Sequence, residues 1–384
     1  MKRTDRILTA PFVLSFVSSF FVFLAIGMVL PVLPLYARGP LGVGDVGVGL
    51  AVGMSSPMAL VAQPFAGRFG DRHGRRILMV GGALIMAIAL AGYTLAGSLA
   101  VLSALRLLTG LGEALVFVGS GTVVADVAPF DRRGEALSIY TIGFWGGLAI
   151  GPVAGEALLG NDRFDLVWLA AAACAGIAAL IALALPETRP ETTEPASGKL
   201  LHPAALRPGL VLVAAVLGFA GFYTFLALYA REIGLDGVGS VFGLLAVIIV
   251  GIRIVGRRLP DRIGPRRASS LALVLLATGL TIVGLWNTQV GLYVGTAVFA
   301  VGQALAFPSL MTLAVEGAPA ADRSSVVGTF TAFADVGFAI GAVSLGAVAD
   351  AAGYEGVFLA AAAASLCGLI VLARMPPGRT PALR

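Results

Sequence analysis

Long apolar runs separated by short polar connections make up most of this chain, and this pattern predicts the fold. The hydrocarbon core of a bilayer needs about 20 consecutive apolar residues per helix. The runs that meet this requirement cover residues 12–36, 46–66, 77–97, 99–125, 137–158, 166–186, 209–230, 239–256, 268–286, 290–314, 325–348 and 355–373. The pattern therefore predicts an all-α membrane protein with twelve transmembrane helices and no room for a separate water-soluble domain.

Composition supports the same fold class. Of the 384 residues, 58% are hydrophobic and only 12% are charged, and the mean hydropathy is +0.95. A soluble domain is typically about one quarter charged, so a water-soluble enzyme and a disordered chain are both excluded. The two cysteines, Cys174 and Cys367, fall in the middle of apolar runs, where we expect them to be packing residues and not a disulfide.

Positive charge is distributed unevenly between the two sets of connections. Of the 26 Lys and Arg residues, only Arg38, Arg163 and Arg231 fall in the loops opposite the N-terminus, and Arg106 and Arg253 fall within spans. The remaining positive charges lie on the side of the N-terminus. The positive-inside rule then predicts that both termini are cytoplasmic. The net charge of +5 therefore reflects topology, and we expect no nucleic-acid partner.

The two halves of the sequence resemble each other when one is shifted by 190 residues. The matching segments are 67–76 with 257–266, 112–119 with 302–309, and 141–151 with 331–341. Transporters are often built from two such repeats, with the substrate site between them near the middle of the membrane. We predict an N-terminal six-helix half (1–186), a cytoplasmic linker (187–208) and a C-terminal six-helix half (209–384).

The connection at 67–76, GRFGDRHGRR, carries the strongest local motif. It resembles the cytoplasmic loop signature of the major facilitator superfamily, and a degraded copy at 257–266 includes Asp261 and Arg262. Glycines permit a tight turn and close helix contact, which we expect of Gly67 and Gly74. The resemblance implies a cytoplasmic gate formed by Asp71, Arg72, Arg75, Arg76 and, at the inner end of the fourth span, Asp126. The alternative is an ordinary basic loop with turn glycines.

Two further motifs resemble those of the drug–proton antiporter branch of this superfamily. The first span carries Gly27-x3-Pro31-x2-Pro34, and the fifth carries a motif made of Gly147, Gly151, Pro152 and Gly155. Glycines at this spacing also let two helices approach closely, whatever the function. Glu156 stands where the branch has a second glycine, which weakens the inference of export. The two interpretations of Glu156 are a proton port and a solvated helix end, and we expect the second.

The fourth span contains an arginine and a glutamate on one face. Arg106 and Glu113 are seven residues, or about 10 Å, apart along the helix. A charge at mid-span costs about 3 kcal/mol, so we expect the pair to face a cavity, where Glu113 exchanges a proton. The segment Arg106 to Gly110 resembles the superfamily's fourth-helix motif, whose arginine is implicated in proton transfer. The alternative is a structural ion pair. The repeat places Gln303 at the position of Glu113.

Asp335 is a carboxylate within the eleventh apolar run, at the position that Trp145 occupies in the first repeat. Ionisable groups inside a membrane span are rare and mark substrate or proton pathways. We therefore predict that Asp335 contacts protons or solute. The alternative is that it pairs with an arginine of an inner loop.

The motifs together predict a proton-coupled transporter that exports a small amphipathic solute and acts as a monomer in a prokaryotic plasma membrane. The sequence has no phosphate-binding loop, no metal-ligand spacing and no hydrolase motif, so we expect no cofactor, no metal and no enzymatic activity. The proton gradient would supply the energy. A proton symporter that imports a sugar, amino acid or organic acid is the nearest alternative. A membrane sensor or enzyme that transports nothing is a more remote one.

Overall fold

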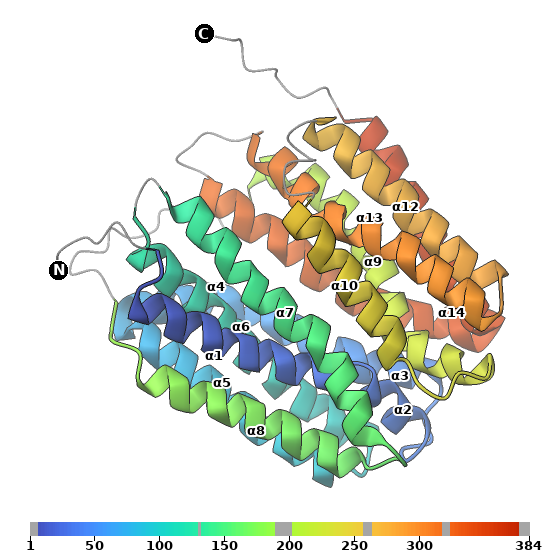
Figure 1. Ribbon diagram of the computed structural model, residues 1–384, viewed down its shortest axis with the longest axis horizontal. Coiled ribbons are helices and arrows are strands. Elements are labelled where there is room, and N and C mark those ends of the chain that lie inside the picture. The colour runs from blue at the N-terminus through green and yellow to red at the C-terminus, as the bar shows by residue number, and fades with distance from the viewer. Residues whose placement is uncertain (1–6, 130–131, 189–201, 256–262, 317–322, 376–384) are drawn as a thin grey trace. The chain divides into compact units, whose positions relative to one another are not determined.

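The computed structural model describes residues 7–129, 132–188, 202–255, 263–316 and 323–375, and every regular element in these ranges is helical (Figure 1). The helices are α1 (Ala10–Val29), α2 (Val32–Arg38), α3 (Asp45–Gly53), α4 (Ser55–His73), α5 (Arg75–Gly92), the short 3₁₀ helix η1 (Tyr93–Leu95), α6 (Leu99–Val127), α7 (Arg133–Leu159), α8 (Phe164–Leu183), α9 (Pro203–Glu232), α10 (Gly239–Val255), α12 (Pro265–Leu285), α13 (Gln289–Glu316) and α14 (Arg323–Ala373). The predicted all-α class is confirmed.

Ten helical segments of the described chain are long and apolar enough to cross a membrane. One of them, Ser325–Ala373, contains two helices, since Gly353 has a non-helical backbone conformation with φ 71°. The apolar segment of α10, Gly239–Ile252, is shorter than the others. The helix ends agree with the predicted runs to within a few residues at most boundaries. The total of twelve spans stays a prediction.

Two of the predicted spans are divided into shorter helices. The first run is divided into α1 and α2 at Pro31, which lacks an amide hydrogen and precedes α2 as its N-cap. The second run is divided at Met54, between α3 and α4. This second break sets Ser55 at the start of α4, where it contacts a buried arginine described below.

The chain forms two compact units that do not follow the sequence halves completely. The first consists of Met1–Val43, Met54–Pro195 and Val238–Gly243. The second consists of Gly44–Gly53, Ala196–Gly237 and Leu244–Arg384. Each unit therefore includes a short stretch from the other half of the sequence. The predicted boundaries at 186 and 209 are not tested by this division, and the six-helix halves stay a prediction.

In the first unit, α1 and α7 lie side by side in contact at their backbones (Figure 1). A methyl group on Gly151 would come within 2.5 Å of the Gly27 Cα atom, and one on Gly147 would come within 2.5 Å of the Phe20 carbonyl oxygen. One on Gly155 would overlap Met28. The glycines of the fifth-span motif therefore form the surface on which α1 packs.

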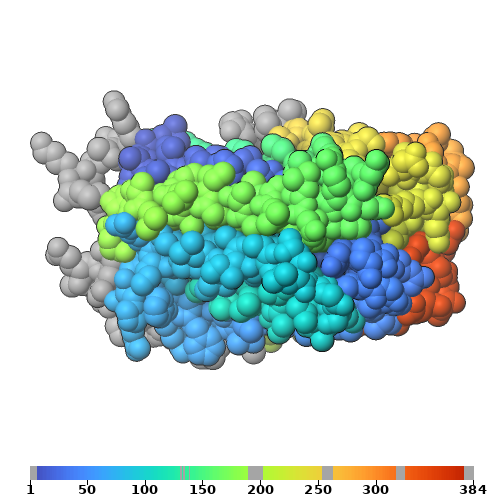
Figure 2. Space-filling model, turned by 90° about the horizontal axis from the view of Figure 1, so that it is seen from below, coloured from blue at the N-terminus to red at the C-terminus, as the bar shows by residue number. Residues whose placement is uncertain are grey.

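The outer face of the first unit exposes many apolar side chains, as expected where lipid replaces water as the solvent. Helix α8, light green in Figure 2, runs along this face beside α5. Its exposed side chains include Leu169 (52% exposed) and Leu180 (67%). Side chains on the opposite side of the same helix, including Trp168 and Ala175, are fully buried. One face of α8 therefore contacts helices and the other is available to lipid.

Candidate functional site

A group of charged side chains joins the ends of α4, α5 and α6. The Arg75 guanidinium, whose residue is only 4% exposed, lies 2.9 Å from the Asp71 carboxylate and 3.1 Å from that of Asp126. It also donates a 2.8 Å hydrogen bond to the Gly70 carbonyl oxygen. A guanidinium satisfies several acceptors at fixed angles, so one buried arginine fixes three helix ends relative to one another.

Glu187 completes this group, which we call the Arg75 cluster (Asp71, Arg75, Asp126 and Glu187). Its carboxylate accepts hydrogen bonds from the backbone amides of Arg75 (2.9 Å) and Arg76 (3.4 Å). These amides begin α5, where a helix has unpaired N–H groups and favours negative charge. The segment that leaves α8 is therefore attached to the start of α5. Glu187 was predicted to begin the linker, and its contact with the start of α5 was not predicted.

The structure corrects the expected role of Gly67. Helix α4 continues to His73, so Gly67 lies inside a helix, and a methyl group there would meet no described atom within 4 Å. Gly74 forms the turn, with φ 106°, and Gly70 makes the close helix contact, because a methyl group there would overlap Leu78. The side chains of Arg72 and Arg76 are exposed beside the cluster.

Asp261 and Arg262, the predicted equivalents of Asp71 and Arg72 in the second repeat, lie outside the described residues. The second unit nevertheless joins corresponding helix ends. At the start of α12, one nitrogen of Arg266 donates to the carbonyl oxygens of Leu372 (3.1 Å), Ala373 (2.9 Å) and Met375 (2.8 Å). Cationic side chains stabilise helix C-termini. At this connection the first unit therefore uses a carboxylate, that of Glu187, and the second unit uses a guanidinium, that of Arg266.

We expect the substitution Arg75→Gln to lower the apparent melting temperature of the purified protein by several degrees. Removing one partner from a buried ion pair costs about 3–5 kcal/mol, because the other charge stays buried without compensation. The neighbouring substitution Arg76→Gln is the control, since the Arg76 side chain is exposed and its backbone amide is unchanged. Equal melting temperatures for the two variants would contradict this account of the Arg75 cluster.

A second prediction concerns the turn that begins α5. Gly74→Ala should destabilise the protein by about 1–3 kcal/mol, since φ 106° with ψ 158° is a conformation that residues with a Cβ rarely adopt. The added methyl group would also overlap the Glu187 carboxylate. Gly81→Ala, inside the same α5 where a methyl group meets no neighbour within 4 Å, should be neutral or stabilising in the same thermal unfolding assay. A Gly74→Ala variant as stable as Gly81→Ala would show that neither constraint matters.

Further along the first unit, Arg106 is buried inside α6. The residue is 4% exposed, and its Nη2 donates a 2.7 Å hydrogen bond to the Ser55 hydroxyl oxygen. The guanidinium also interacts electrostatically with the Glu113 carboxylate on the same helix. A methyl group on Gly110 would overlap the Ser55 carbonyl group. The start of α4 therefore rests on α6 where the arginine lies, and Ser55 is a partner that the sequence analysis did not identify.

Buried hydroxyl groups lie in the core of the same unit. The Tyr140 hydroxyl and the Ser120 hydroxyl are hydrogen-bonded at 2.5 Å, and Tyr140 also donates to Ser19 at 3.4 Å. Ser15 donates to the Ser120 carbonyl oxygen at 3.2 Å. These contacts hold α1, α6 and α7 together and satisfy polar groups in a layer without water. We assign this network a packing role.

The predicted polar residues of the second repeat lie in the second unit. Asp335, on α14, and Gln303, on α13, are both half-buried. Trp145, the counterpart of Asp335, lies on α7 in the first unit, where its ring packs edge-on against Phe144 at 4.9 Å between centroids. The roles of Asp335 and Gln303 in proton or solute contact stay predictions.

Glu156 does not behave as the solvated helix end that the sequence analysis favoured. It is half-buried near the end of α7, and its carboxylate accepts a hydrogen bond from the Val238 amide. A methyl group on Gly239, the first residue of α10, would overlap this carboxylate. A sequence with a second glycine here could not make this contact.

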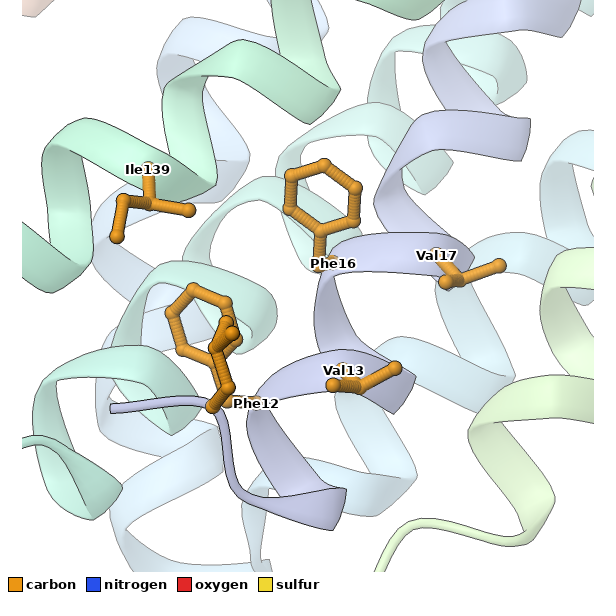
Figure 3. Close-up of a pocket in the computed structure, with 6 residues that line it drawn as sticks. Phe12, Val13, Phe16, Val17 and Ile139 are labelled. Atoms are coloured by element: carbon orange, nitrogen blue, oxygen red, sulfur yellow. The ribbon is translucent and has the colours of Figure 1, made fainter. Parts of the chain in front are cut away.

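An apolar pocket of about 280 Å³ opens between α1 and α7. Figure 3 shows Phe12, Val13, Phe16 and Val17 of α1 and Ile139 of α7 around it. Leu8 and Val13 on its rim are exposed. Because all six lining residues are apolar, the pocket offers no group that would bind a proton or recognise a polar solute. We do not assign it as the transport site.

Comparison with known proteins identifies the family. Residues 15–289 and 256–384 match the family model described as Major Facilitator Superfamily. An uncharacterized MFS-type transporter of Salmonella typhimurium is 28% identical over 361 residues, which cover 92% of this chain and 93% of that protein. The uncharacterized MFS-type transporter YhhS of Escherichia coli is 26% identical over 378 residues, covering 94% and 92% of the two chains.

Solved structures show the same fold. The human organic anion transporter MFSD10 superposes with a TM-score of 0.72 at 22% sequence identity, covering 94% of this chain and 99% of that one. These relatives are multi-pass membrane transporters and not enzymes, in agreement with the apolar helices and the motifs of the loop and of the fourth span. The chain belongs to the Major Facilitator Superfamily and is a membrane transporter of small-molecule substrates.

Proposed function

We propose that this transporter exports a small amphipathic solute in exchange for protons. The pair formed by the buried Arg106 and the half-buried Glu113 on α6 is the observation that supports this proposal most strongly. A charged group inside a span costs free energy, and α6 carries two of opposite sign that interact with each other. Glu113 is the proposed proton carrier, and Arg106 sets how readily its carboxyl group binds and releases the proton.

The surroundings of the pair support a role beyond packing. The Arg106 guanidinium donates a hydrogen bond to a neutral acceptor, the Ser55 hydroxyl. Ser55 lies at the break between α3 and α4. A serine oxygen stabilises the guanidinium without neutralising it, so the positive charge remains to act on Glu113. The solute and the proton would then compete for binding to the Glu113 carboxylate.

The Arg75 cluster is the proposed cytoplasmic gate. It joins three helix ends through one guanidinium and attaches the segment after α8 through Glu187. Such a network holds the cytoplasmic helix ends in a fixed arrangement, and its disruption would permit them to separate. On this proposal, Arg75→Gln alters the balance between inward-open and outward-open states in addition to lowering stability.

The direction of transport rests on the fifth-span motif. Gly147, Gly151 and Gly155 support the drug–proton antiporter branch through the resemblance of their spacing to its fifth-helix motif, and they place α7 directly on α1. Glu156 departs from that motif, so uptake with protons is the alternative. The human structural relative transports organic anions by its name, but 22% identity supports the fold alone. Arg106 would also suit an anionic group on the solute.

The proposal can be tested with energised inside-out membrane vesicles. Lumenal pH is recorded while lipophilic cations, organic anions, sugars and amino acids are added in turn. We expect one class of solute to release protons from the acidified lumen in vesicles with the wild-type protein. Glu113→Gln should abolish this release, because its amide cannot exchange a proton.

Glu135→Gln is the matched control, since Glu135 is exposed at the start of α7 and pairs with Arg132. It should release protons at the wild-type rate. Undiminished release by Glu113→Gln would overturn the assignment of the proton carrier. Solute-driven entry of protons into the lumen, in place of release, would indicate uptake with protons.

A further inference from the structure

The apolar pocket between α1 and α7 has a floor of core residues and an exposed rim (Figure 3). Phe12 is only 1% exposed and packs in a core cluster with Tyr140. The Phe16 ring lies directly against α7, since a methyl group on Gly143 would come within 2.8 Å of it. Val13, on the rim, is 45% exposed. The core therefore fixes the shape of the pocket, while its outer side stays open.

The pocket lies close to the end at which both of its helices start. Successive glycines of α7 approach successively later residues of α1, from Gly143 against Phe16 to Gly155 against Met28, so the two helices run in the same direction. The lining residues of α1 extend to Val17, about 10 Å from the start of that helix. One leaflet of the hydrocarbon core is about 15 Å thick. The pocket therefore has a depth that suits part of an acyl chain.

The face of α7 that continues from the pocket is apolar and exposed. Ile142 (54% exposed) and Ile150 (53%) follow Ile139 by 3 and 11 residues, which places all three on one face of the helix. An exposed apolar face of a membrane-spanning helix contacts lipid. The pocket thus opens on a surface where lipid tails are the solvent.

Positive charge gathers where α1 and α7 start. The side chain of Arg132, which precedes α7, is 42% exposed and lies 2.8 Å from Glu135. Neither helix has a side-chain cap hydrogen bond, and uncapped helix N-termini attract phosphate groups. In the sequence, five basic residues and only three acidic ones lie before or within these starts. They are Lys2, Arg3, Arg6, Arg132 and Arg133, and Asp5, Asp131 and Glu135.

Charge is needed for selectivity, because an apolar lining alone does not select a lipid. Lipid tails are as apolar as the pocket, so an acyl chain gains little by leaving the surrounding bilayer. Basic residues at the membrane surface do attract anionic headgroups. A lipid with one chain in this pocket has its phosphate near the helix starts, where the basic residues outnumber the acidic ones.

We propose that this pocket binds one acyl chain of an anionic phospholipid, whose phosphate lies at the starts of α1 and α7. The lipid fills the space beside the close contact of the two helices and contacts both of them. All of the lining residues belong to the first unit. The inference rests neither on proton antiport nor on the direction of transport.

Competition between two lipids tests the proposal. The purified full-length protein in an uncharged detergent is incubated with equal amounts of phosphatidylglycerol and phosphatidylcholine that carry the same acyl chains. Bound lipids are counted by native mass spectrometry. We expect one retained phosphatidylglycerol molecule, preferred over phosphatidylcholine at least about tenfold. Equal retention of the two lipids would show that the pocket binds detergent or lipid without selection, and the proposal would fail.

Two variants fill the pocket from its rim. Val13→Trp and Leu8→Trp add a ring at exposed positions (45% and 66%), so each should fold and lower the retention of phosphatidylglycerol at least about fivefold through overpacking. Leu169→Trp, on α8 at 52% exposure, is the matched control and should retain the lipid as the wild type does. Retention by both filling variants equal to that of Leu169→Trp would exclude this pocket as the binding site.

A charge variant separates the helix starts from other basic positions. The test variant combines Lys2→Gln, Arg3→Gln, Arg6→Gln and Arg132→Gln. Its control removes four exposed arginines at the ends of α4, α9, α12 and α14, namely Arg68→Gln, Arg207→Gln, Arg267→Gln and Arg374→Gln. We expect the test variant to lose its preference for phosphatidylglycerol and the control to keep it. The reverse result would place the anionic lipid elsewhere and contradict the proposal.

Thermal unfolding gives an independent readout. A ligand that binds only the folded state raises the melting temperature, so phosphatidylglycerol should stabilise the wild type and Leu169→Trp but not Val13→Trp or Leu8→Trp. Without lipid, all four proteins should melt at the same temperature. Equal stabilisation of the filling variants and the wild type by phosphatidylglycerol would overturn the proposal.

Discussion

Arg106→Gln should reduce solute transport at least about a hundredfold while the protein remains folded. The guanidinium is buried, donates at 2.7 Å to the Ser55 hydroxyl and interacts with the Glu113 carboxylate. Its removal takes the positive charge away from Glu113 and leaves the Ser55 hydroxyl without its donor, and an increase of about 3 kcal/mol in the transport barrier corresponds to this loss of rate. The measurement is the initial rate of solute flux in proteoliposomes, normalised to the amount of folded protein.

Graded variants show which property of Arg106 matters. Arg106→Lys keeps the positive charge but loses the planar donor geometry, so we expect an intermediate loss of about tenfold. Ser55→Ala removes one hydrogen bond and should have a smaller effect than Arg106→Lys. Arg68→Gln, an exposed position on α4, is the control. Transport by Arg106→Gln at a rate close to wild type would show that the pair is structural.

Gly151→Val should prevent most of the protein from folding. A Cβ atom at this position would lie 2.5 Å from the Gly27 Cα atom and 2.7 Å from the Leu24 carbonyl oxygen. These are backbone atoms, so no side-chain rotation relieves the overlap and α1 would have to move away from α7. Overpacking of a close-packed contact costs about 1–3 kcal/mol or more. We expect the monodisperse fraction in size-exclusion chromatography to fall at least about tenfold.

Gly146→Ala is the matched control for this substitution. It lies on the same helix, but its Cβ atom would have only ordinary contact with the Phe20 ring, at 3.8 Å. This variant should fold and transport like the wild type. If Gly151→Val gave as much folded protein as Gly146→Ala, the close contact of α1 with α7 would not be needed for folding.

The fold could be predicted from the sequence because the bilayer imposes a length on each apolar run. The predicted span at 99–125 and the observed α6 at Leu99–Val127 differ by two residues. The breaks within spans were harder to predict. Pro31 marks one of them, and Gly53 and Pro57 flank the break between α3 and α4. Glycine and proline also occur inside uninterrupted helices such as α7, which contains Pro152, so these residues alone do not identify a break.

The candidate site was predicted only in part. Arg106, Glu113, Arg75 and Asp126 stand out because a charged side chain in or beside an apolar run is costly. Their partners do not stand out, since Ser55 is a common residue in spans and Glu187 reads as the first polar residue of a linker. Both are identified by three-dimensional contacts with segments more than 50 residues away.

The role of Glu156 was mispredicted for the same reason, because its partner is a group distant in the sequence. Sequence motifs identified it only as a departure from a glycine pattern, and a carboxylate near a helix end is most often solvated. Its partner is the Val238 amide, a backbone group that no side-chain motif reveals.

The most direct test of proton antiport is the flux of the identified solute across proteoliposomes that carry an imposed pH gradient and no other energy source. We predict that an acidic lumen drives solute into the liposomes above its external concentration and that an alkaline lumen does not. Glu113→Gln should still exchange labelled for unlabelled solute but should no longer accumulate it under either gradient. Accumulation driven by an alkaline lumen, or accumulation by Glu113→Gln equal to that of the wild type, would contradict proton antiport through Glu113.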